Sequence, residues 1–330
     1  MERDRVRDVD RVEHGGSNDP DVLDLSANIN PRTPPGVTDV YREALEEARQ
    51  YPTEPPDAYR ETAAEYVSCA PEAVVPTPGG LAAIRLAIDL AVEPGDSVLV
   101  PAPSFSSYAR EVRLHGAEPT FVPHDGVLSV DPTDHSLVIV CNPNNPTGTL
   151  YPREELLAFL ERCRETDTHL LVDEAFLGFT DQVSLAGRSG VTVARSLTKL
   201  FGLPGIRAGF AVATGETPRR PWNVSVPALA TGRYSMRQSK FVAETRRRVR
   251  SERERLRDGL GDRFDVYPSA APFVLVEVGD VSVDALLDTA DENGVALRDA
   301  RTVRGLDNHV RVAVRDREAT DRTHEVFADV

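Results

Sequence analysis

The chain has 330 residues, enough at roughly 150 residues per domain for two domains or for a large body with a smaller companion. Its 38 Lys and Arg residues face 53 Asp and Glu residues, and the net charge of -15 argues against a nucleic-acid partner held through phosphate contacts. The apolar runs are too short to cross a bilayer and no apolar signal region begins the chain, so we expect a cytoplasmic protein without membrane contact. The histidines lack metal-ligand spacing, so we assign no metal.

The first part of the chain, about 1–40, is rich in proline and irregular, which predicts an N-terminal arm lying across other elements. From about residue 70 to 215, short apolar strands alternate with helices. The expected strands are 97–100, 119–122, 137–141, 169–173, 191–195 and 208–213, and the expected helices are 81–91, 106–114 and 152–164. This order predicts an α/β fold with a mainly parallel sheet, whose ligands bind at the carboxyl ends of its strands.

After Trp222 the pattern changes to a charged helical stretch at about 233–260. Strands at 273–278 and 309–314 and a helix at 283–293, with Ser282 as its N-cap, indicate a smaller α+β domain. We therefore divide the chain into an N-terminal arm at 1–40, which contributes to the small domain, a large domain at 41–220 and a small C-terminal domain at 221–330.

Lysine chemistry is restricted to two positions, because Lys199 and Lys240 are the only lysines. Lys240 is in a predicted helix among arginines and is most simply a surface charge. Lys199 follows a strand in a loop with Gly and Pro, where burial or a neighbouring cation such as Arg207 can lower its pKa and allow an imine with an aldehyde. High acidity with few lysines is typical of proteins kept soluble in concentrated salt, although codon bias explains it equally well.

Other strand-end loops carry groups that match one cofactor. The Ser196 hydroxyl, the Arg207 guanidinium and the helix start at Gly79-Gly80 can hold a phosphate. Asp173 can pair with a protonated ring nitrogen, and Asn145 can donate to a phenolate oxygen. An aldehyde, a phosphate, a pyridinium and a phenolate together describe pyridoxal 5'-phosphate.

Three segments, NPNNPTG at 142–148, DEAF at 173–176 and SLTKLFGLPGIRAGF at 196–210, resemble the fold type I pyridoxal-phosphate enzymes of the class I and II aminotransferase family. The resemblance covers most of the chain and implies the pyridoxal-phosphate-dependent transferase-like fold. It implies that Lys199 is the Schiff-base lysine, Asp173 the partner of the pyridine nitrogen and Asn145 a ligand of the ring hydroxyl. The remaining cofactor ligands that it implies are Ser196, Arg207, Gly80 and Leu81 at the phosphate, Phe105 stacked on the ring, and Tyr51 reaching the phosphate of a neighbouring subunit in a homodimer.

Within the family, further segments resemble the threonine-phosphate decarboxylases of cobalamin biosynthesis, which are close relatives of histidinol-phosphate aminotransferases. These segments are HGG at 14–16, SANINP at 26–31, and RDARTVRGLD at 298–307 followed by RVAVR at 311–315. The resemblance implies that Arg311 binds a substrate carboxylate, that Arg298 helps to hold a substrate phosphate, and that an arm including His14 and Asn30 closes over the site.

The sequence also departs from the family pattern. Phe176 replaces a tyrosine that donates to the ring hydroxyl in many relatives, and Pro272 occupies a position often held by Asn. Motifs shared by decarboxylases and aminotransferases do not distinguish the two reactions, so a histidinol-phosphate-type aminotransferase is the first alternative. A noncatalytic cofactor-binding regulator is disfavoured by the acidic charge and by the lack of a recognisable DNA-binding module.

Overall fold

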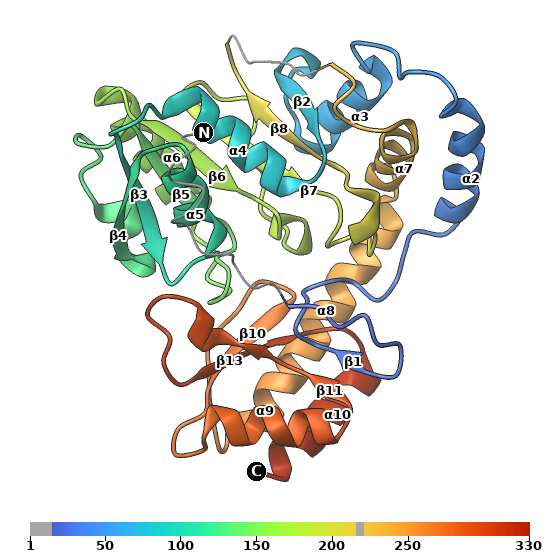
Figure 1. Ribbon diagram of the computed structural model, residues 1–330, viewed down its shortest axis with the longest axis vertical. Coiled ribbons are helices and arrows are strands. Elements are labelled where there is room, and N and C mark those ends of the chain that lie inside the picture. The colour runs from blue at the N-terminus through green and yellow to red at the C-terminus, as the bar shows by residue number, and fades with distance from the viewer. Residues whose placement is uncertain (1–14, 216–220) are drawn as a thin grey trace.

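The computed structural model describes residues 15–215 and 221–330. Its largest sheet forms the upper body of the molecule (Figure 1) and has seven strands in the order β2-β8-β7-β6-β5-β3-β4. These strands are β2 (Val74–Thr77), β3 (Ser97–Ala102), β4 (Glu118–Pro123), β5 (Leu137–Cys141), β6 (His169–Asp173), β7 (Val191–Ser196) and β8 (Gly209–Ala213). Strand β8 alone runs antiparallel to its neighbours, so the expected mainly parallel sheet is confirmed.

Helices cover both faces of this sheet. On one face α4 (Gly80–Ala91) and α5 (Ser107–Leu114) pack against Leu137, Ile139 and Cys141, whereas on the other α3 (Asp57–Val67) and α6 (Arg153–Glu165) share a core with Val138 and Val140. Successive residues of β5 therefore point to opposite, equally apolar layers. This explains why its sequence is apolar throughout and not alternating.

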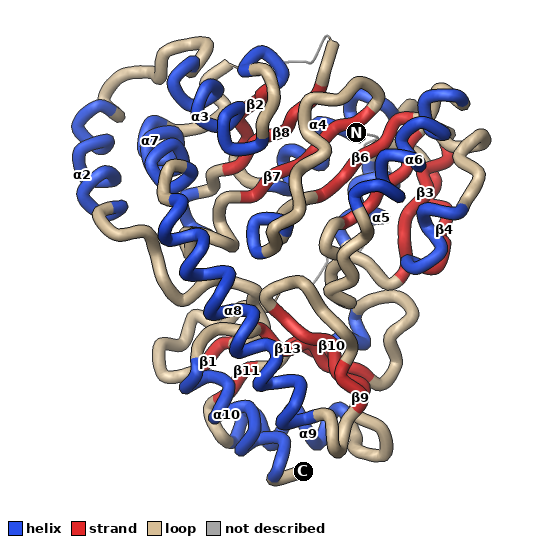
Figure 2. The backbone as a smooth tube through the Cα atoms, turned by 180° about the vertical axis from the view of Figure 1, so that it is seen from behind, coloured by secondary structure: helices blue, strands red, loops and turns tan. Residues whose placement is uncertain are grey.

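The lower body contains a four-stranded antiparallel sheet in the order β12-β13-β10-β9. Its strands are β9 (Asp265–Val266), β10 (Phe273–Glu277), β12 (Arg298–Asp299) and β13 (His309–Ala313), and its helices are α9 (Val283–Glu292) and α10 (Arg317–Ala328). The N-terminal segment joins this body, because β1 (Leu23–Asp24) pairs in parallel with β11 (Val295–Ala296). Helix α8 (Ser239–Leu260) runs from the upper to the lower body (Figure 2).

The expected helical stretch at 233–260 is helical except for a break at residues 237–238. The chain forms α7 (Val226–Met236), turns at Arg237 and Gln238, and then begins α8. Helix α7 packs against α3 and α2 (Val37–Glu47) beside the large sheet, although residues after 220 were expected to form the small domain. Helix α8 then leads to the small sheet. Residues 233–240 include neither Gly nor Pro, so the sequence carries no stop signal for the break.

Helices α2, α3 and α10 and strand β2 were not among the expected elements. The N-cap expected at Ser282 is confirmed, since its hydroxyl accepts from the backbone N–H of Ala285. Across residues 15–215 and 221–330, no helix combines the length and the apolar character needed to span a membrane.

Candidate active site

One pocket lies where the carboxyl ends of β5, β6 and β7 and the start of α4 meet β12 and β13. It contains most of the residues singled out from the sequence: Gly80, Leu81, Phe105, Asn145, Asp173, Ser196, Lys199, Arg207, Arg298 and Arg311. Residues separated by more than 200 positions therefore line a single concave surface. The parallel topology explains this convergence, because consecutive βα loops emerge at the same edge of the sheet.

The start of α4 and Arg207 form a cradle suited to a phosphate. Gly79 has φ 93 and precedes the helix, so unsatisfied backbone N–H groups of the first turn face the space beside Ser196. The Arg207 guanidinium is held by the carbonyls of Pro78 (3.2 Å) and Pro204 (3.1 Å). A Cβ at Gly79 would lie 2.6 Å from Arg207 Nη2 and would displace this guanidinium, and the positive φ itself favours glycine.

Lys199 lies among positive charges at the centre of the pocket. Burial, followed by the positive charges of Arg311 and Arg207, lowers its pKa from 10.5 to about 8, with Asp24 opposing the shift. At pH 7 a lysine with this pKa is neutral in roughly one molecule in ten, several hundred times more often than an ordinary lysine, and the neutral amine is the nucleophile. The lowered pKa expected of Lys199 from the sequence is therefore present in the structure, and Arg311 contributes to it together with the expected Arg207.

Asp173 ends β6 and is held from two sides. The Tyr108 hydroxyl donates to Oδ2 at 2.6 Å, and the backbone N–H of Ala175 donates to Oδ1 at 3.0 Å. Burial raises the pKa of Asp173, whereas both hydrogen bonds lower it by favouring the carboxylate. Burial also raises the pKa of Tyr108, which keeps its hydroxyl protonated as a donor. The carboxylate is therefore positioned for a cationic partner inside the pocket.

Arg311 connects the small sheet to the loop after β5. Its Nη1 donates to Asn145 Oδ1 at 2.7 Å and its Nη2 donates to the Ser26 carbonyl at 2.7 Å. Its buried Nε has no partner among the described residues, so this guanidinium retains donors for a ligand. Because Asn145 accepts through its oxygen, its NH2 group is the one left to donate to a cofactor oxygen.

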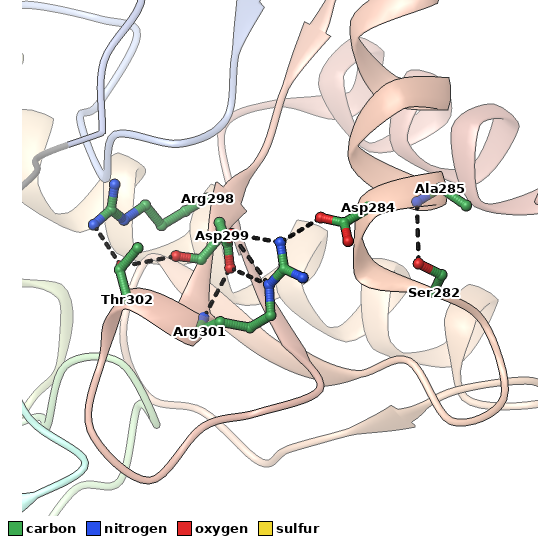
Figure 3. Close-up of polar contacts among 7 residues, drawn as sticks. All are labelled: Ser282, Asp284, Ala285, Arg298, Asp299, Arg301 and Thr302. Atoms are coloured by element: carbon green, nitrogen blue, oxygen red, sulfur yellow. Dashed lines mark hydrogen bonds and ion pairs between the residues drawn. The ribbon is translucent and has the colours of Figure 1, made fainter.

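Arg298 stands beside Arg311, because the two residues are paired across β12 and β13. Its Nη2 donates to Thr302 Oγ1 at 2.9 Å, and Thr302 in turn donates to the Asp299 carbonyl (Figure 3). Asp299 also accepts from Arg301, whose Nη2 reaches Asp284 on α9 at 2.6 Å. The strand end that carries Arg298 is thus attached to a helix of the small body.

The donor set of the pocket fits pyridoxal phosphate. The cradle at Gly79, Ser196 and Arg207 suits its phosphate, Asp173 suits its protonated ring nitrogen, and the Asn145 amide suits its ring oxygen. Phe105 lines the same pocket and packs edge-on against Tyr108, with ring centroids 5.4 Å apart. Phe176 also lines the pocket but brings no hydroxyl, and its ring packs on Phe273.

Three expected residues are not placed in this pocket. Tyr51 is 81% exposed and packs against Trp222, so its expected contact with a neighbouring subunit stays a prediction. His14 lies outside the described residues. Asn30, expected at the substrate, is buried behind the pocket, where its amide donates to the Leu200 carbonyl at 2.7 Å. A tight turn, in which the Ile29 N–H donates to the Ala27 carbonyl, separates it from the pocket.

Two pocket residues escaped sequence reasoning. Asn28 is only 3% exposed, lines the pocket, and has an Oδ1 without a partner in the described part of the chain. Tyr108 follows Phe105 by three residues and lies in the first turn of α5, where its backbone N–H donates to the Phe105 carbonyl. The signals were the repeated Asn of the SANINP segment and this helical spacing, but neither identifies a contact by itself.

Comparison with known proteins supports the cofactor assignment. A model of the family described as aminotransferase class I and II matches residues 20–327. A histidinol-phosphate aminotransferase from Halorubrum lacusprofundi is 34% identical, covering 98% of this chain and 94% of its own length. A protein from Caldanaerobacter subterraneus subsp. tengcongensis, provisionally named a threonine-phosphate decarboxylase, is 30% identical and covers 88% of this chain and 86% of its own length.

The fold is shared with solved structures. The crystal structure of the histidinol-phosphate aminotransferase from Clostridium acetobutylicum superposes with a TM-score of 0.86 at 24% identity, covering 93% of this chain and 98% of that chain. This agreement confirms the expected α/β fold with its large, mostly parallel sheet.

Proposed function

Because the chain belongs to the class I and II aminotransferase family, whose members use pyridoxal 5'-phosphate, we propose that it decarboxylates L-threonine O-3-phosphate to (R)-1-amino-2-propanol O-2-phosphate, a reaction of cobalamin biosynthesis. The pocket described above is the site of this proposal. Lys199 and Asp173 are its proposed catalytic residues, and Arg298 and Arg311 its proposed substrate ligands.

The observation that carries the proposal is the pairing of Arg298 with Arg311. The two residues are direct cross-strand partners, so their side chains leave neighbouring positions of the sheet toward one pocket. Two adjacent cations repel each other. Burial lowers the pKa of Arg311 most, and the positive charge of Arg298 accordingly lowers it as well. A ligand with two acidic groups relieves this repulsion.

L-Threonine O-3-phosphate has such a pair of groups, since its carboxylate and its phosphate are attached to adjacent carbons. Guanidinium groups bind both anions through paired N–H donors. Histidinol phosphate carries the phosphate but no carboxylate. A short substrate held at both ends loses rotation about Cα, which allows the protein to choose the bond that lies perpendicular to the cofactor ring.

Pyridoxal phosphate, when bound, supplies an electron-accepting ring that takes up the electron pair of a bond broken at Cα. Asp173 would hold the protonated ring nitrogen of the bound cofactor, and the Tyr108 hydroxyl orients Asp173 and favours its ionised form against the effect of burial. Lys199 Nζ, with its pKa near 8, is suited to return a proton to Cα after carbon dioxide has left.

Sequence similarities support both this reaction and one alternative. The HGG, SANINP and RDARTVRGLD segments resemble threonine-phosphate decarboxylases, and a relative of that provisional name is 30% identical. Several relatives of about equal identity are named histidinol-phosphate aminotransferases, which makes this activity the second candidate. In that reaction Lys199 would move a proton at Cα and a keto acid would accept the amino group.

The deciding experiment follows the carboxyl carbon. Protein loaded with pyridoxal phosphate is given carboxyl-labelled L-threonine O-3-phosphate without a keto acid, and labelled carbon dioxide is expected. Lys199→Met should abolish release, and Arg298→Met should lower turnover as well as affinity more than Arg298→Lys does. Conversion of histidinol phosphate with 2-oxoglutarate, without release of labelled carbon dioxide, would establish the second candidate instead. Turnover of either substrate counts against a noncatalytic regulator.

We propose in addition a cytoplasmic homodimer in which Tyr51 of one subunit contacts the cofactor phosphate bound by the other. The exposure of Tyr51 beside Trp222 supports a contact outside its own subunit. Two large aromatic rings on one surface are typical of a protein interface.

A further inference from the structure

Asn30 forms a buried polar node outside the ligand pocket. Asn30 is only 5% exposed, and both polar atoms of its side chain form hydrogen bonds. Its Nδ2 donates to the Leu200 carbonyl at 2.7 Å and to Thr245 Oγ1 at 3.3 Å, and its Oδ1 accepts from Arg248 Nη2 at 2.7 Å. Its backbone N–H donates to the carbonyl of Lys199 at 3.0 Å.

The node fixes the backbone on which Lys199 stands. The Lys199 and Leu200 carbonyls are consecutive, and both accept hydrogen bonds from Asn30. The fit is close, since a Cβ at Gly202 would lie 2.4 Å from the carbonyl oxygen of Arg32 and 2.6 Å from that of Asn30. Gly202, at φ 64, is therefore required where the two segments cross.

The other end of the same segment is attached to the small body. We call residues 23–32 the strap. Leu25 accepts from the Ala313 N–H, Ser26 accepts from Arg311, and Asp24 accepts from Arg315, all through backbone carbonyls. Arg248 of α8 donates to both Asn30 and the Arg315 carbonyl, which closes the connection.

We propose that Asn30 is a positioning residue for Lys199, and that through it the strap ties the position of the Lys199 backbone to β13, which carries Arg311. The inference rests on the assignment of Lys199 in the proposed function but not on the choice of substrate. Only the bond to the Leu200 carbonyl depends on the Asn30 side chain, because the bond to the Lys199 carbonyl comes from the backbone N–H. The proposal also gives Asn30 a role different from the substrate contact expected from the sequence.

The proposal predicts that losing the Asn30 amide loosens the lysine loop and admits water to the Lys199 amine. The charged groups that face this amine are Arg311, Arg207 and Asp24, and none of them is changed by a substitution at Asn30. Partial hydration therefore raises the pKa of Lys199 from about 8 toward its ordinary value of 10.5, by roughly one pH unit.

The test measures the pH dependence of acylation of Lys199 in the full chain freed of cofactor, read by peptide mass spectrometry. Lys240 is the internal reference, because its side chain is 91% exposed and it is the only other lysine. Asn30→Ala and the milder Asn30→Ser should raise the midpoint for Lys199. Thr245→Val is the matched control, since Thr245 is also buried and accepts a hydrogen bond from Asn30, but within the described part of the chain it forms no hydrogen bond with the lysine loop.

The outcomes separate this inference from the proposed function. Asn30 variants that melt at a lower temperature but keep the parental midpoint would show a purely structural role and overturn the inference, as would an equal shift in Thr245→Val. Borohydride trapping in the cofactor-bound parent checks the Lys199 assignment by itself. Cofactor trapped on Lys240 would overturn that assignment and the inference with it, whereas cofactor on Lys199 with an unmoved midpoint would overturn the inference alone.

Discussion

The buried amine of Lys199 should reduce the stability of the cofactor-free protein. Burial, Arg311 and Arg207 lower its pKa from 10.5 to about 8, so folding disfavours the protonated form. At 1.36 kcal/mol per pKa unit, this difference corresponds to about 3 kcal/mol. We therefore expect Lys199→Met, which keeps the length of the side chain and removes its charge, to increase the free energy of unfolding at neutral pH by about 3 kcal/mol.

The pH dependence follows from the direction of this shift. Above pH 10.5 the amine is neutral in both the folded and the unfolded chain, so the parent has no deficit there. As the pH falls, the unfolded chain binds the proton first, and the deficit is complete once the pH is below about 8. The advantage of Lys199→Met should accordingly be largest at neutral pH and disappear in strong alkali.

The assay is urea unfolding of cofactor-free protein across this pH range, with Lys240→Met as the control. Lys240 is exposed, so its replacement should change the free energy of unfolding by no more than about 0.5 kcal/mol. The reasoning is refuted if Lys199→Met is no more stable than the parent at neutral pH, or if its advantage persists undiminished above pH 10.5. A confirmed advantage would mean that the site keeps a reactive amine at the expense of stability.

Three further outcomes test the site and the surface. Tyr108→Phe should lower the unfolding free energy by about 1.5 to 3 kcal/mol while Asp173 is ionised, and by less once acid protonates it; equal losses at both pH values would contradict the charged hydrogen bond. Tyr51→Phe should weaken cofactor retention by about 1.5 to 3 kcal/mol in equilibrium dialysis, and unchanged retention would remove the intersubunit contact. With a net charge of -15, the melting temperature should rise with potassium chloride concentration, and a flat or falling curve would count against a salt-adapted surface.

Much of the large sheet could be predicted because its elements are locally determined. Strands β5 and β6 have the expected bounds, 137–141 and 169–173, and α4 begins at Gly80, one residue before its expected start. The missed elements carry weaker local signals. Helix α2 begins after Gly36 without a side-chain cap, and α3 buries small residues such as Ala63 and Ala64 whose pattern is not strongly amphipathic.

The break between α7 and α8 shows why some boundaries need the tertiary structure. No Gly or Pro separates Met236 from Ser239, so the usual stop signals of a helix are missing at this break. The chain turns there because α7 is held against α2 and α3, whereas α8 must cross to the small sheet. Competing packing partners, which sequence periodicity does not report, therefore set the boundary.

From the sequence alone, residue types and strand-end positions were enough to select Lys199, Asp173 and Arg207, which the structure brings into one pocket. Only the tertiary structure decided what each group touches. Tyr108 reaches Asp173 from α5, and Arg311 reaches Asn145 from the small sheet 166 positions away. The tertiary structure also shows that Asn30 binds the backbone of the lysine loop whereas Asn28 lines the pocket, although the two asparagines are only two residues apart. Such contacts depend on a local turn and on the closure of distant segments, which chain order does not encode.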